Sequence, residues 1–368
     1  MGYQPAGLDF ALIGHQESWQ RIVLLVNRIR SEEGMSGLSL SQMKQLYPFI
    51  PPRPLFELEV ASLSGKVVKG VYIESFISPD ECDASHLHSN IGKVRKACIC
   101  AAGLGASIGA LGGLTSIMLE AGESSFKQLG DSFFTTGNTL TSAFIVKGIE
   151  NACQQTDRSL SVSRLLIIGS TGDIGSACVR YFTGKVKKIL LHARRPGPLR
   201  VQAGVLRSSD QPVSYSTRLE DLLPEATIVI CAASSLINCT ATSLLPAHAI
   251  ICDAGYPKNM GGGNAQRSLF FPGGLGYVKN GFNTNPPYYK DLYRFPEPNV
   301  VHGCLLEAII LAMEGRSAAY SSGRGNISIK AMENILQLAA GHGIEPAPLF
   351  NGNGYWEQAK QTDLYGYH

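Results

Sequence analysis

Short, uniformly apolar runs alternate along the chain with stretches in which apolar residues recur at helical spacing. This alternation predicts an α/β protein, because parallel strands that are buried on both faces are apolar throughout. The predicted strands lie at 8–14, 106–111, 165–168, 187–195, 228–233 and 249–253, and 55–63 and 66–77 are expected to pair across the turn at 64–65. The predicted helices span 19–30, 85–105, 141–154, 304–314 and 329–340.

Three segments show neither pattern. Four prolines between Pro48 and Pro54 are expected to keep 31–54 free of regular structure. The segment 261–298 is rich in Gly, Pro, Asn and Tyr, and we expect a long irregular excursion of the kind that carries function. The segment 346–368 is expected to form a loosely docked tail.

A glycine-rich turn follows the apolar run that ends at Ile168, and apolar residues at helical spacing follow the turn. Glycines at this place let a chain turn sharply, bring backbone N–H groups to a pyrophosphate and pack a helix closely on a strand. A tight turn without a ligand also uses glycine, but the strand before and the helix after favour a dinucleotide site. The predicted cofactor-binding residues are Gly169, Ser170, Thr171, Gly172, Asp173, Ile174 and Gly175, with Ala233 at the end of a neighbouring run.

The second predicted strand indicates which dinucleotide binds. NAD-binding proteins commonly carry an acid at the end of this strand, where it accepts a hydrogen bond from the ribose 2′-hydroxyl. This chain has Arg194 and Arg195 there instead, which suit a 2′-phosphate, although one of them could belong to a solvated basic loop. The sequence therefore predicts NADPH.

Length and composition narrow the class of protein. A chain of 368 residues is too long for one typical core and predicts two domains, while a net charge of +3 gives no indication of nucleic-acid binding. The nine cysteines are odd in number and several lie inside apolar runs, as buried thiols in a reducing compartment do. With no secretory pattern at the start, the expected location is the cytoplasm. Cys98 and Cys100 lack the spacing of zinc ligands, so no metal site is expected.

One segment competes for a membrane assignment. Residues 99–119 carry no charge over the length of a membrane span. Glycines and other small residues make the segment weakly hydrophobic, and Gly112 and Gly113 would interrupt a helix. We therefore expect a helix end, a buried strand and a glycine turn here, and no integral membrane span.

Six blocks of the sequence resemble the cyanobacterial long-chain acyl-[acyl carrier protein] reductases. The blocks Thr-Thr-Gly-Asn-Thr and Gly-Tyr-Pro-Lys-Asn, in register with the glycine turn, make this resemblance specific. The blocks occur in order between residue 11 and about residue 340, at 11–15, 70–75, 110–113, 135–139, 172–177 and 255–259.

The resemblance implies the reduction of fatty acyl thioesters to aldehydes with NADPH. The implied partners are acyl carrier protein or a CoA thioester as the acyl donor, and an enzyme that consumes the aldehyde. In that family a cysteine near the start of a late helix, within Ala-Cys-Phe-Ala-Glu, becomes acylated, and this role maps to Cys304. Here the flanking residues differ, and the chain also carries the tail at 346–368.

The residues around Cys304 suit a nucleophile on their own account. A thiol in the first turn of a helix has its thiolate stabilised by the helix dipole and by unpaired N–H groups, which is expected to lower its pKa. His302 is close enough in sequence to accept the proton. An inert cysteine on an apolar core helix is the alternative that position alone leaves open.

Four other residues are candidates for the substrate side. Lys258 follows a strand end and could donate to an oxyanion, although a surface lysine fits the same pattern. Thr136 and Asn138 lie where the first domain passes into the second, with a helix N-cap as the alternative for Asn138. His15, at the end of the first strand, could line the substrate or be structural.

Together these features predict a two-domain α/β protein. An N-terminal α/β substrate domain (1–137) precedes a Rossmann-like, doubly wound NADPH-binding domain (138–300), and C-terminal helices and a tail (301–368) close the cleft. The predicted function is NADPH-dependent reduction of a fatty acyl thioester to an aldehyde through a cysteine acyl-enzyme. The alternatives are a Rossmann carbonyl reductase without a covalent intermediate and a non-enzymatic NADPH-binding scaffold.

Overall fold

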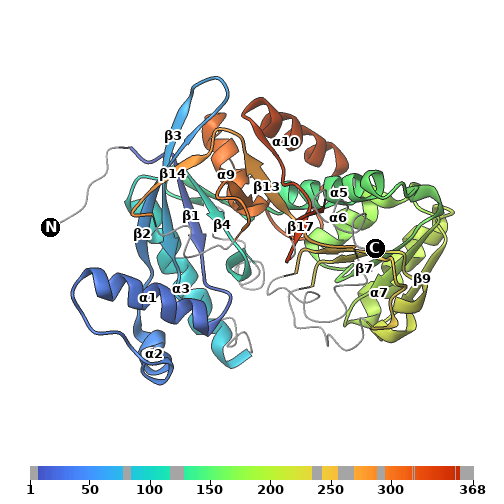
Figure 1. Ribbon diagram of the computed structural model, residues 1–368, viewed down its shortest axis with the longest axis horizontal. Coiled ribbons are helices and arrows are strands. Elements are labelled where there is room, and N and C mark those ends of the chain that lie inside the picture. Colours follow the sequence, from blue (N-terminus) through green and yellow to red (C-terminus); the bar gives the residue numbers. More distant parts are fainter. Residues whose placement is uncertain are drawn as a thin grey trace, which may run out of the picture. The chain divides into compact units, whose positions relative to one another are not determined.

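The computed structural model describes residues 7–77, 84–116, 128–233, 243–255, 269–287, 295–316, 318, 320–352 and 354–356. The chain forms two compact units (Figure 1). Unit 1 comprises Met1–Gly137, Val278–Gly323 and Leu338–Ile344, and unit 2 comprises Asn138–Tyr277, Arg324–Gln337 and Glu345–His368. The chain first passes from unit 1 to unit 2 after Gly137, where the sequence-based division also ends the first domain. Its later passages between the units differ from that division, because 278–300 belongs to unit 1 and 301–368 is shared between the units.

Unit 1 is built on a seven-stranded mixed sheet with the order β14-β2-β3-β1-β4-β6-β5. Its central strands β3, β1, β4 and β6 run parallel, and β2, β5 and β14 pair antiparallel to their neighbours. The predicted hairpin at 55–77 is confirmed as β2 and β3. The strands are β1 (Phe10–Gly14), β2 (Arg53–Ala61), β3 (Val67–Glu74), β4 (Ile108–Leu111), β5 (Gln128–Leu129), β6 (Ser132–Thr135) and β14 (Phe282–Asn285).

The helices of unit 1 include one that the sequence analysis missed. The prediction that 31–54 lacks regular structure is wrong, because α2 (Leu40–Leu46) and the 3₁₀ helix η1 (Tyr47–Phe49) lie there. Ser39 and Gln42 form a capping box that starts α2, and Pro48 is tolerated because it falls in the first turn of η1. The other helices are α1 (Trp19–Glu32), α3 (Ala84–Gly103) and α9 (Gly303–Met313).

Helix α9 lies at the core of unit 1. It is apolar around almost its whole circumference, as a helix surrounded by protein must be, and it packs on β1, β3 and β4. Every residue of α9 except Cys304 is buried. Cys304 is thus the one position at which this helix keeps exposed surface.

Unit 2 is the predicted dinucleotide-binding fold. Its six strands are all parallel, in the order β12-β11-β10-β7-β8-β9, and the chain runs outward from the centre in both directions, as in doubly wound sheets. The strands are β7 (Arg164–Ile168), β8 (Lys188–His192), β9 (Val213–Ser216), β10 (Ile228–Cys231), β11 (Ile250–Asp253) and β12 (Leu269–Pro272). The helices are α5 (Asn138–Gln155), α6 (Asp173–Phe182) and α7 (Pro196–Ser208).

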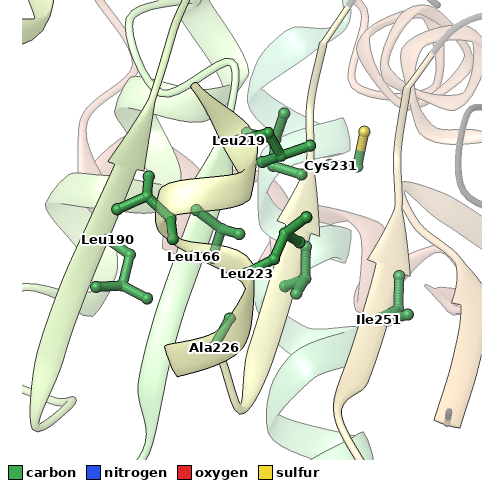
Figure 2. Packing of buried hydrophobic residues seen from close by; sticks show 10 residues of the cluster. Leu166, Leu190, Leu219, Leu223, Ala226, Cys231 and Ile251 are labelled. Atoms are coloured by element: carbon green, nitrogen blue, oxygen red, sulfur yellow. The ribbon is translucent and has the colours of Figure 1, made fainter. Parts of the chain in front are cut away.

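One face of the unit 2 sheet is covered by two short 3₁₀ helices, η4 (Leu219–Asp221) and η5 (Leu223–Glu225). Figure 2 shows how Leu219, Leu223 and Ala226 lie over side chains from four neighbouring strands. The strand residues in this cluster are Leu166, Ile168, Leu190, Val229, Cys231 and Ile251. Cys231 therefore fills a core position, as its apolar surroundings in the sequence suggest.

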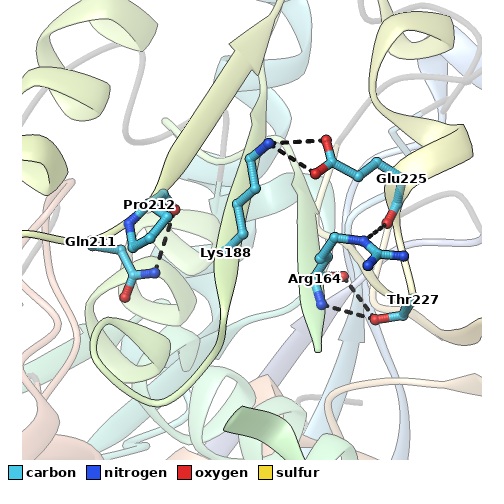
Figure 3. A network of polar contacts seen from close by, with 6 residues as sticks. All are labelled: Arg164, Lys188, Gln211, Pro212, Glu225 and Thr227. Atoms are coloured by element: carbon cyan, nitrogen blue, oxygen red, sulfur yellow. Dashed lines mark hydrogen bonds and ion pairs between the residues drawn. The ribbon is translucent and has the colours of Figure 1, made fainter. Parts of the chain in front are cut away.

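A polar network closes the amino-terminal edge of the same sheet. Figure 3 shows Arg164 bonded to Thr227 and Glu225, and Lys188 paired with the Glu225 carboxylate at 2.8 Å. Arg164 and Lys188 are the first residues of β7 and β8 and stand side by side in the register. Because ligands of such sheets bind at the carboxyl ends of the strands, these cations stabilise the fold and do not belong to the cofactor site.

The remaining segments correct two further expectations. The stretch 261–298 is not irregular throughout, since β12, β13 (Leu275–Val278) and β14 lie in it. The predicted loose tail is docked as far as Trp356, which is 4% exposed, donates its indole N–H to the Phe270 carbonyl and packs edge-on against Phe271. The other elements are η3 (Leu160–Val162), β15 (Val300–His302), α10 (Ile329–Gly341), β16 (Ile344–Pro346), β17 (Phe350–Asn351) and β18 (Gly354–Tyr355).

The uncharged stretch around residue 105 folds as its glycines predict. Helix α3 ends at Gly103, and β4 begins at Ile108 within the sheet of unit 1. Within the ranges given above, no helix combines the length and the hydropathy that a membrane span requires.

Candidate active site

The glycine turn joins β7 to α6 at the carboxyl edge of the unit 2 sheet. Gly169 has a positive φ of 83°, and the N–H groups of Gly169 and Ser170 donate to the His192 carbonyl at 2.9 and 3.1 Å. Gly172 is the N-cap residue of α6, and no side chain caps this helix. The first N–H groups of α6 are thus left for a ligand, and such groups favour an anion.

The three glycines have different roles. A Cβ on Gly175 would lie 2.2 Å from the Gly169 carbonyl oxygen, and one on Gly169 would lie 2.8 Å from the Ala232 carbonyl oxygen. These two glycines are required by the fold. Gly172 has an ordinary extended backbone, and a Cβ there would meet only the Gly169 oxygen at 3.2 Å. Because Gly172 has no side chain, space remains beside the turn for a ligand to approach the backbone.

Ser170 adds a second sign that the turn receives a polar ligand. Its side chain is fully buried, and its Oγ has no hydrogen-bond partner among the described residues. Buried hydroxyls are normally bonded, so an orphaned one beside an uncapped helix fits a bound phosphate or ribose. The half-buried Thr171 and Ile174 belong to the same turn, and Ala233 lies two residues beyond β10 at the same edge. The residues of this turn fit a dinucleotide.

Asp173 is held inside unit 2. Its Oδ2 accepts from Asn138 Nδ2 at 2.9 Å, and its Oδ1 accepts from the Gly325 N–H at 2.8 Å. Asn138 is the first residue of α5, so its amide supports the acid next to the glycine turn. The structure therefore brings two residues together that the sequence analysis assigned separately to cofactor and substrate.

Arg194 and Arg195 are both exposed just beyond the end of β8, and Arg195 is the N-cap residue of α7. His192 precedes them as the last residue of β8, and burial lowers the pKa of its imidazole. No acid lies between His192 and Arg195. This end of β8 thus presents two exposed cationic side chains.

In unit 1, Cys304 lies against two glycines from different loops. A Cβ on Gly112, directly after β4, would lie 3.8 Å from the Cys304 Sγ. A Cβ on Gly137, which has a φ of +67°, would lie 2.2 Å from both the Cα and the carbonyl oxygen of Cys304. The carboxyl edge of the parallel strands therefore carries the thiol, as this edge carries ligand sites in other open sheets. Both glycines occur in the family blocks but were not predicted as site residues.

The ionisation of Cys304 corrects one expectation. Burial is the largest cause that raises its pKa, to about 11; the N–H groups of Gly113 and Leu305 oppose the rise, and the charge of Glu307 adds a smaller part of it. The predicted lowering at the helix start is therefore wrong, because desolvation of the thiolate outweighs the two N–H donors. The resting side chain is a thiol.

His15 supports the turn that faces this thiol. Its Nε2 accepts from the Leu114 N–H at 2.9 Å, so the ring proton is on Nδ1, 3.0 Å from the Gln16 carbonyl oxygen. Burial lowers its pKa to about 4, which keeps the ring neutral. His15 thus ties the end of β1 to the glycine turn after β4.

A buried carboxyl group that was not predicted lies at the end of β3. Glu74 is fully buried and accepts from Gln16 Nε2 at 2.7 Å, from the Tyr72 hydroxyl at 3.2 Å and from the Phe76 N–H at 3.2 Å. Burial outweighs these hydrogen bonds and raises its pKa to about 7. In sequence it follows the apolar run of the block at 70–75, and that run predicts only a strand.

Three predicted residues have less defined roles. The Thr136 N–H donates to the Ser321 carbonyl at 3.2 Å, and its side chain is 6% exposed. His302 is the N-cap residue of α9, with its ring edge-on to Phe295 at 5.4 Å. Lys258 lies outside the described residues.

The raised pKa of Glu74 predicts a pH-dependent stability. The folded state holds this proton more tightly than the unfolded state, so the contribution is full below about pH 4.5 and is lost as the pH rises through about 7. We expect Glu74→Gln to remove a slope worth about 3 kcal/mol across this interval, measured by urea unfolding at several pH values. The exposed Glu59, changed to Gln, is the control and leaves the slope in place. Equal slopes in Glu74→Gln and the unaltered chain would contradict the prediction.

Known proteins resemble this chain to different degrees. No protein-family model matches the chain. A long-chain acyl-[acyl-carrier-protein] reductase of Synechococcus elongatus is 31% identical over 352 residues, which cover 92% of this chain and 99% of that protein. The chain belongs to the long-chain acyl-[acyl-carrier-protein] reductase family.

Solved structures show looser likenesses. The dipicolinate synthase A chain of Bacillus subtilis is 15% identical, with a TM-score of 0.36 over 73% of this chain and 89% of that one. The L-tryptophan dehydrogenase of Nostoc punctiforme is 13% identical, with a TM-score of 0.36 over 90% of this chain and 80% of that one. Membership of the reductase family, together with the dinucleotide turn of unit 2, makes this chain an NAD(P)-dependent oxidoreductase.

Proposed function

We propose that the protein reduces a long-chain fatty acyl thioester to an aldehyde with NADPH, through an acyl-enzyme on Cys304. The observation that carries this proposal is the place of Cys304: it is partly exposed where the rest of α9 is buried, at the strand edge where such folds hold ligands. The family relationship supports the proposed substrate, since the Synechococcus relative is named as a reductase of long-chain acyl-[acyl-carrier-protein].

The first step is a transfer of the acyl group between two thiols. The Cys304 sulfur bonds to the thioester carbonyl carbon, the bond to the donor's sulfur breaks, and the Cys304 proton goes to the departing thiol. The exchange neither gains nor loses a proton overall, so a raised thiol pKa does not oppose its equilibrium. His302 is the proposed proton carrier. The N–H groups that lie at the Cys304 sulfur, with Lys258, are the proposed donors to the carbonyl oxygen.

The second step depends on the residues of unit 2. When bound, NADPH would supply a hydride to the acyl carbonyl carbon. The bond from that carbon to the Cys304 sulfur then breaks to give the aldehyde, and the sulfur takes up a proton from solvent, with His302 as the proposed carrier. The uncapped start of α6 and the Ser170 hydroxyl are proposed to hold the diphosphate, and Arg194 and Arg195 the 2′-phosphate. An aldehyde-consuming enzyme is the proposed downstream partner, because aldehydes are reactive products.

The raised pKa of Cys304 favours a second candidate function. A thiol that stays protonated is a weaker nucleophile, which would suit a carbonyl reductase that transfers hydride without a covalent intermediate. The two candidates differ in one measurable species, the acylated protein.

Intact-mass spectrometry tests the proposal directly. The full chain is incubated with acyl-CoAs of graded length, or with acyl carrier protein loaded with the same chains, without NADPH. We expect one added acyl group, greatest for long chains, located on Cys304 by peptide mapping and released as aldehyde when NADPH is added. Aldehyde formation by a protein that never carries an acyl group would favour the second candidate.

The cofactor preference gives a separate prediction. NADPH is expected to bind at least about tenfold more tightly than NADH, because a charge-assisted phosphate contact readily supplies 1.4 kcal/mol. Arg194→Ala should lose this preference by weakening NADPH while leaving NADH almost unchanged, as measured by fluorescence titration. Arg207→Ala, an exposed arginine at the far end of α7, is the matched control. Equal affinities of the unaltered protein for the two cofactors would contradict the prediction.

A further inference from the structure

A buried carboxylate lies one helical turn after Cys304. Glu307 is fully buried within α9, although this helix is otherwise apolar. Glutamates are almost never fully buried unless they are paired, because removing a carboxylate from water is costly. The energetic cost of this residue therefore calls for a specific role in unit 1.

Two hydroxyl groups bind the Glu307 carboxylate. Thr135 Oγ1 donates to Oε1 at 2.6 Å, and Ser321 Oγ donates to Oε2 at 3.0 Å. The Thr135 oxygen also accepts from the Ser321 N–H at 3.1 Å and from the Gly137 N–H at 3.5 Å. Of the two acceptors within reach of its hydroxyl, the Glu307 carboxylate at 2.6 Å is nearer than the Ser321 carbonyl oxygen at 3.3 Å. Both carboxylate oxygens thus receive hydrogen bonds, the pattern that suits the ionised form.

The same network reaches the backbone of Cys304. Gly137, whose N–H points to Thr135, approaches Cys304 so closely that a Cβ would overlap its Cα. Glu307 also lies at position i+3 from Cys304, which places both side chains on one face of α9. The carboxylate therefore anchors the loop against the thiol and adds a negative charge on the same side of the helix.

We propose that Glu307 is a positioning residue for Cys304: clamped by Thr135 and Ser321, it fixes the first turn of α9 and holds a negative charge on the face of the helix that carries the thiol. This role deepens the proposed function and rests on Cys304 as its nucleophile. A protonated thiol resists oxidation and alkylation, which act on the thiolate. The clamp thus protects the nucleophile between turnovers.

Other titratable groups near α9 do not replace Glu307 in this role. Among the described residues, the strands beneath α9 bring His15 and Glu74 to the same edge, and His302 precedes the helix. Lys66 donates to the Met313 carbonyl at the opposite end of α9, and Lys69 is exposed on β3. Glu307 is the charged side chain that acts on the Cys304 sulfur.

The direction of the effect follows from the charge, which is a smaller cause of the raised pKa of Cys304 than burial. For each unit by which this pKa falls, the thiolate fraction at neutral pH rises about tenfold. Each thiolate becomes roughly threefold less nucleophilic over the same unit. Removing the Glu307 charge is therefore expected to speed alkylation at neutral pH and to move the midpoint of the pH profile to lower pH.

The test measures alkylation of Cys304 by iodoacetamide between pH 6 and 11, by quantitative peptide mapping of the full chain. Glu307→Gln keeps the shape of the side chain and removes its charge, and we expect a midpoint below that of the unaltered protein, by more than the spread of replicate titrations. Glu314→Gln removes a charge from the C-cap of the same helix and leaves the midpoint unchanged. A loss of packing alone would lower the melting temperature of Glu307→Gln without moving its midpoint, and that result would overturn the proposal.

A second measurement keeps the proposal testable if Glu307→Gln fails to fold. The unaltered protein must then show a Cys304 midpoint above the ordinary thiol value of about 8.5, and a midpoint at or below that value would overturn the proposal. Alkylation needs neither thioester nor cofactor. If Glu307→Gln has a lower midpoint than the unaltered protein, and the unaltered protein is never acylated, the result supports the Glu307 clamp and rejects the acyl-enzyme.

Discussion

Cys304→Ser is expected to lose acylation and to form aldehyde at a rate at least about a thousandfold below that of the unaltered protein. A serine hydroxyl at this position ionises far less than a thiol does. The thiol supplies a usable fraction of thiolate even with its pKa near 11. Intact mass measures the first loss, and aldehyde formation with NADPH measures the second. Cofactor binding should be unchanged, because the dinucleotide turn belongs to unit 2.

Two controls make the Cys304 result interpretable. Cys100 is also partly exposed and also has a pKa raised by burial, so Cys100→Ser tests whether any such thiol accounts for the acylation. The melting temperature of Cys304→Ser must stay within a few degrees of the unaltered protein, so that lost activity is not lost fold. A stable Cys304→Ser protein that reduces thioesters at the original rate would reject the acyl-enzyme.

Gly172→Val is expected to weaken the binding of NADPH by at least about a hundredfold, or about 2.7 kcal/mol, while the protein remains folded. The backbone of Gly172 is extended, a conformation that valine adopts readily, and a Cβ there would meet only the Gly169 carbonyl oxygen, at 3.2 Å, a tight contact that a shift of a few tenths of an ångström relieves. The added methyl groups would therefore point to the place where a pyrophosphate approaches the start of α6. Isothermal titration of the variant measures the affinity.

The other glycines provide contrasting controls for Gly172. Gly204→Val adds the same side chain on α7, where a Cβ meets nothing within 4 Å, and should bind NADPH normally. Gly175→Ala should lower the melting temperature sharply, because its Cβ would overlap the Gly169 carbonyl oxygen. If Gly172→Val binds NADPH with unchanged affinity, the turn is structural and the cofactor assignment fails.

The parallel sheet of unit 2 was predictable because its evidence is local. A strand buried on both faces is apolar at every position, so β7, β10 and β11 stand out as short runs ended by turn residues. The order of glycines after β7 adds the dinucleotide turn in the same few residues. In such a segment the apolar sequence pattern follows directly from burial on both faces of the sheet, so the pattern by itself predicts the environment of the strand.

Pairings between distant segments were less accessible. β14 lies in a stretch whose composition suggests a loop, and it becomes a strand because β2 offers it an edge, with Phe282 opposite Val60. The ionisation of Cys304 has the same explanation. Its place at a helix start is visible in sequence, but the burial that raises its pKa comes from surroundings such as Gly112 and Gly137, far away in the chain.

The path of the chain between the two units has a consequence for its synthesis. The chain leaves unit 1 after Gly137 and returns at Val278, so the whole parallel sheet of unit 2 is made before α9 exists. Because α9 packs on β1 and β4, the core of unit 1 waits for residues near the other end of the chain. We infer that a growing chain completes the parallel sheet of unit 2 first and the surroundings of Cys304 last. A chain whose synthesis stops after unit 2's sheet therefore lacks Cys304.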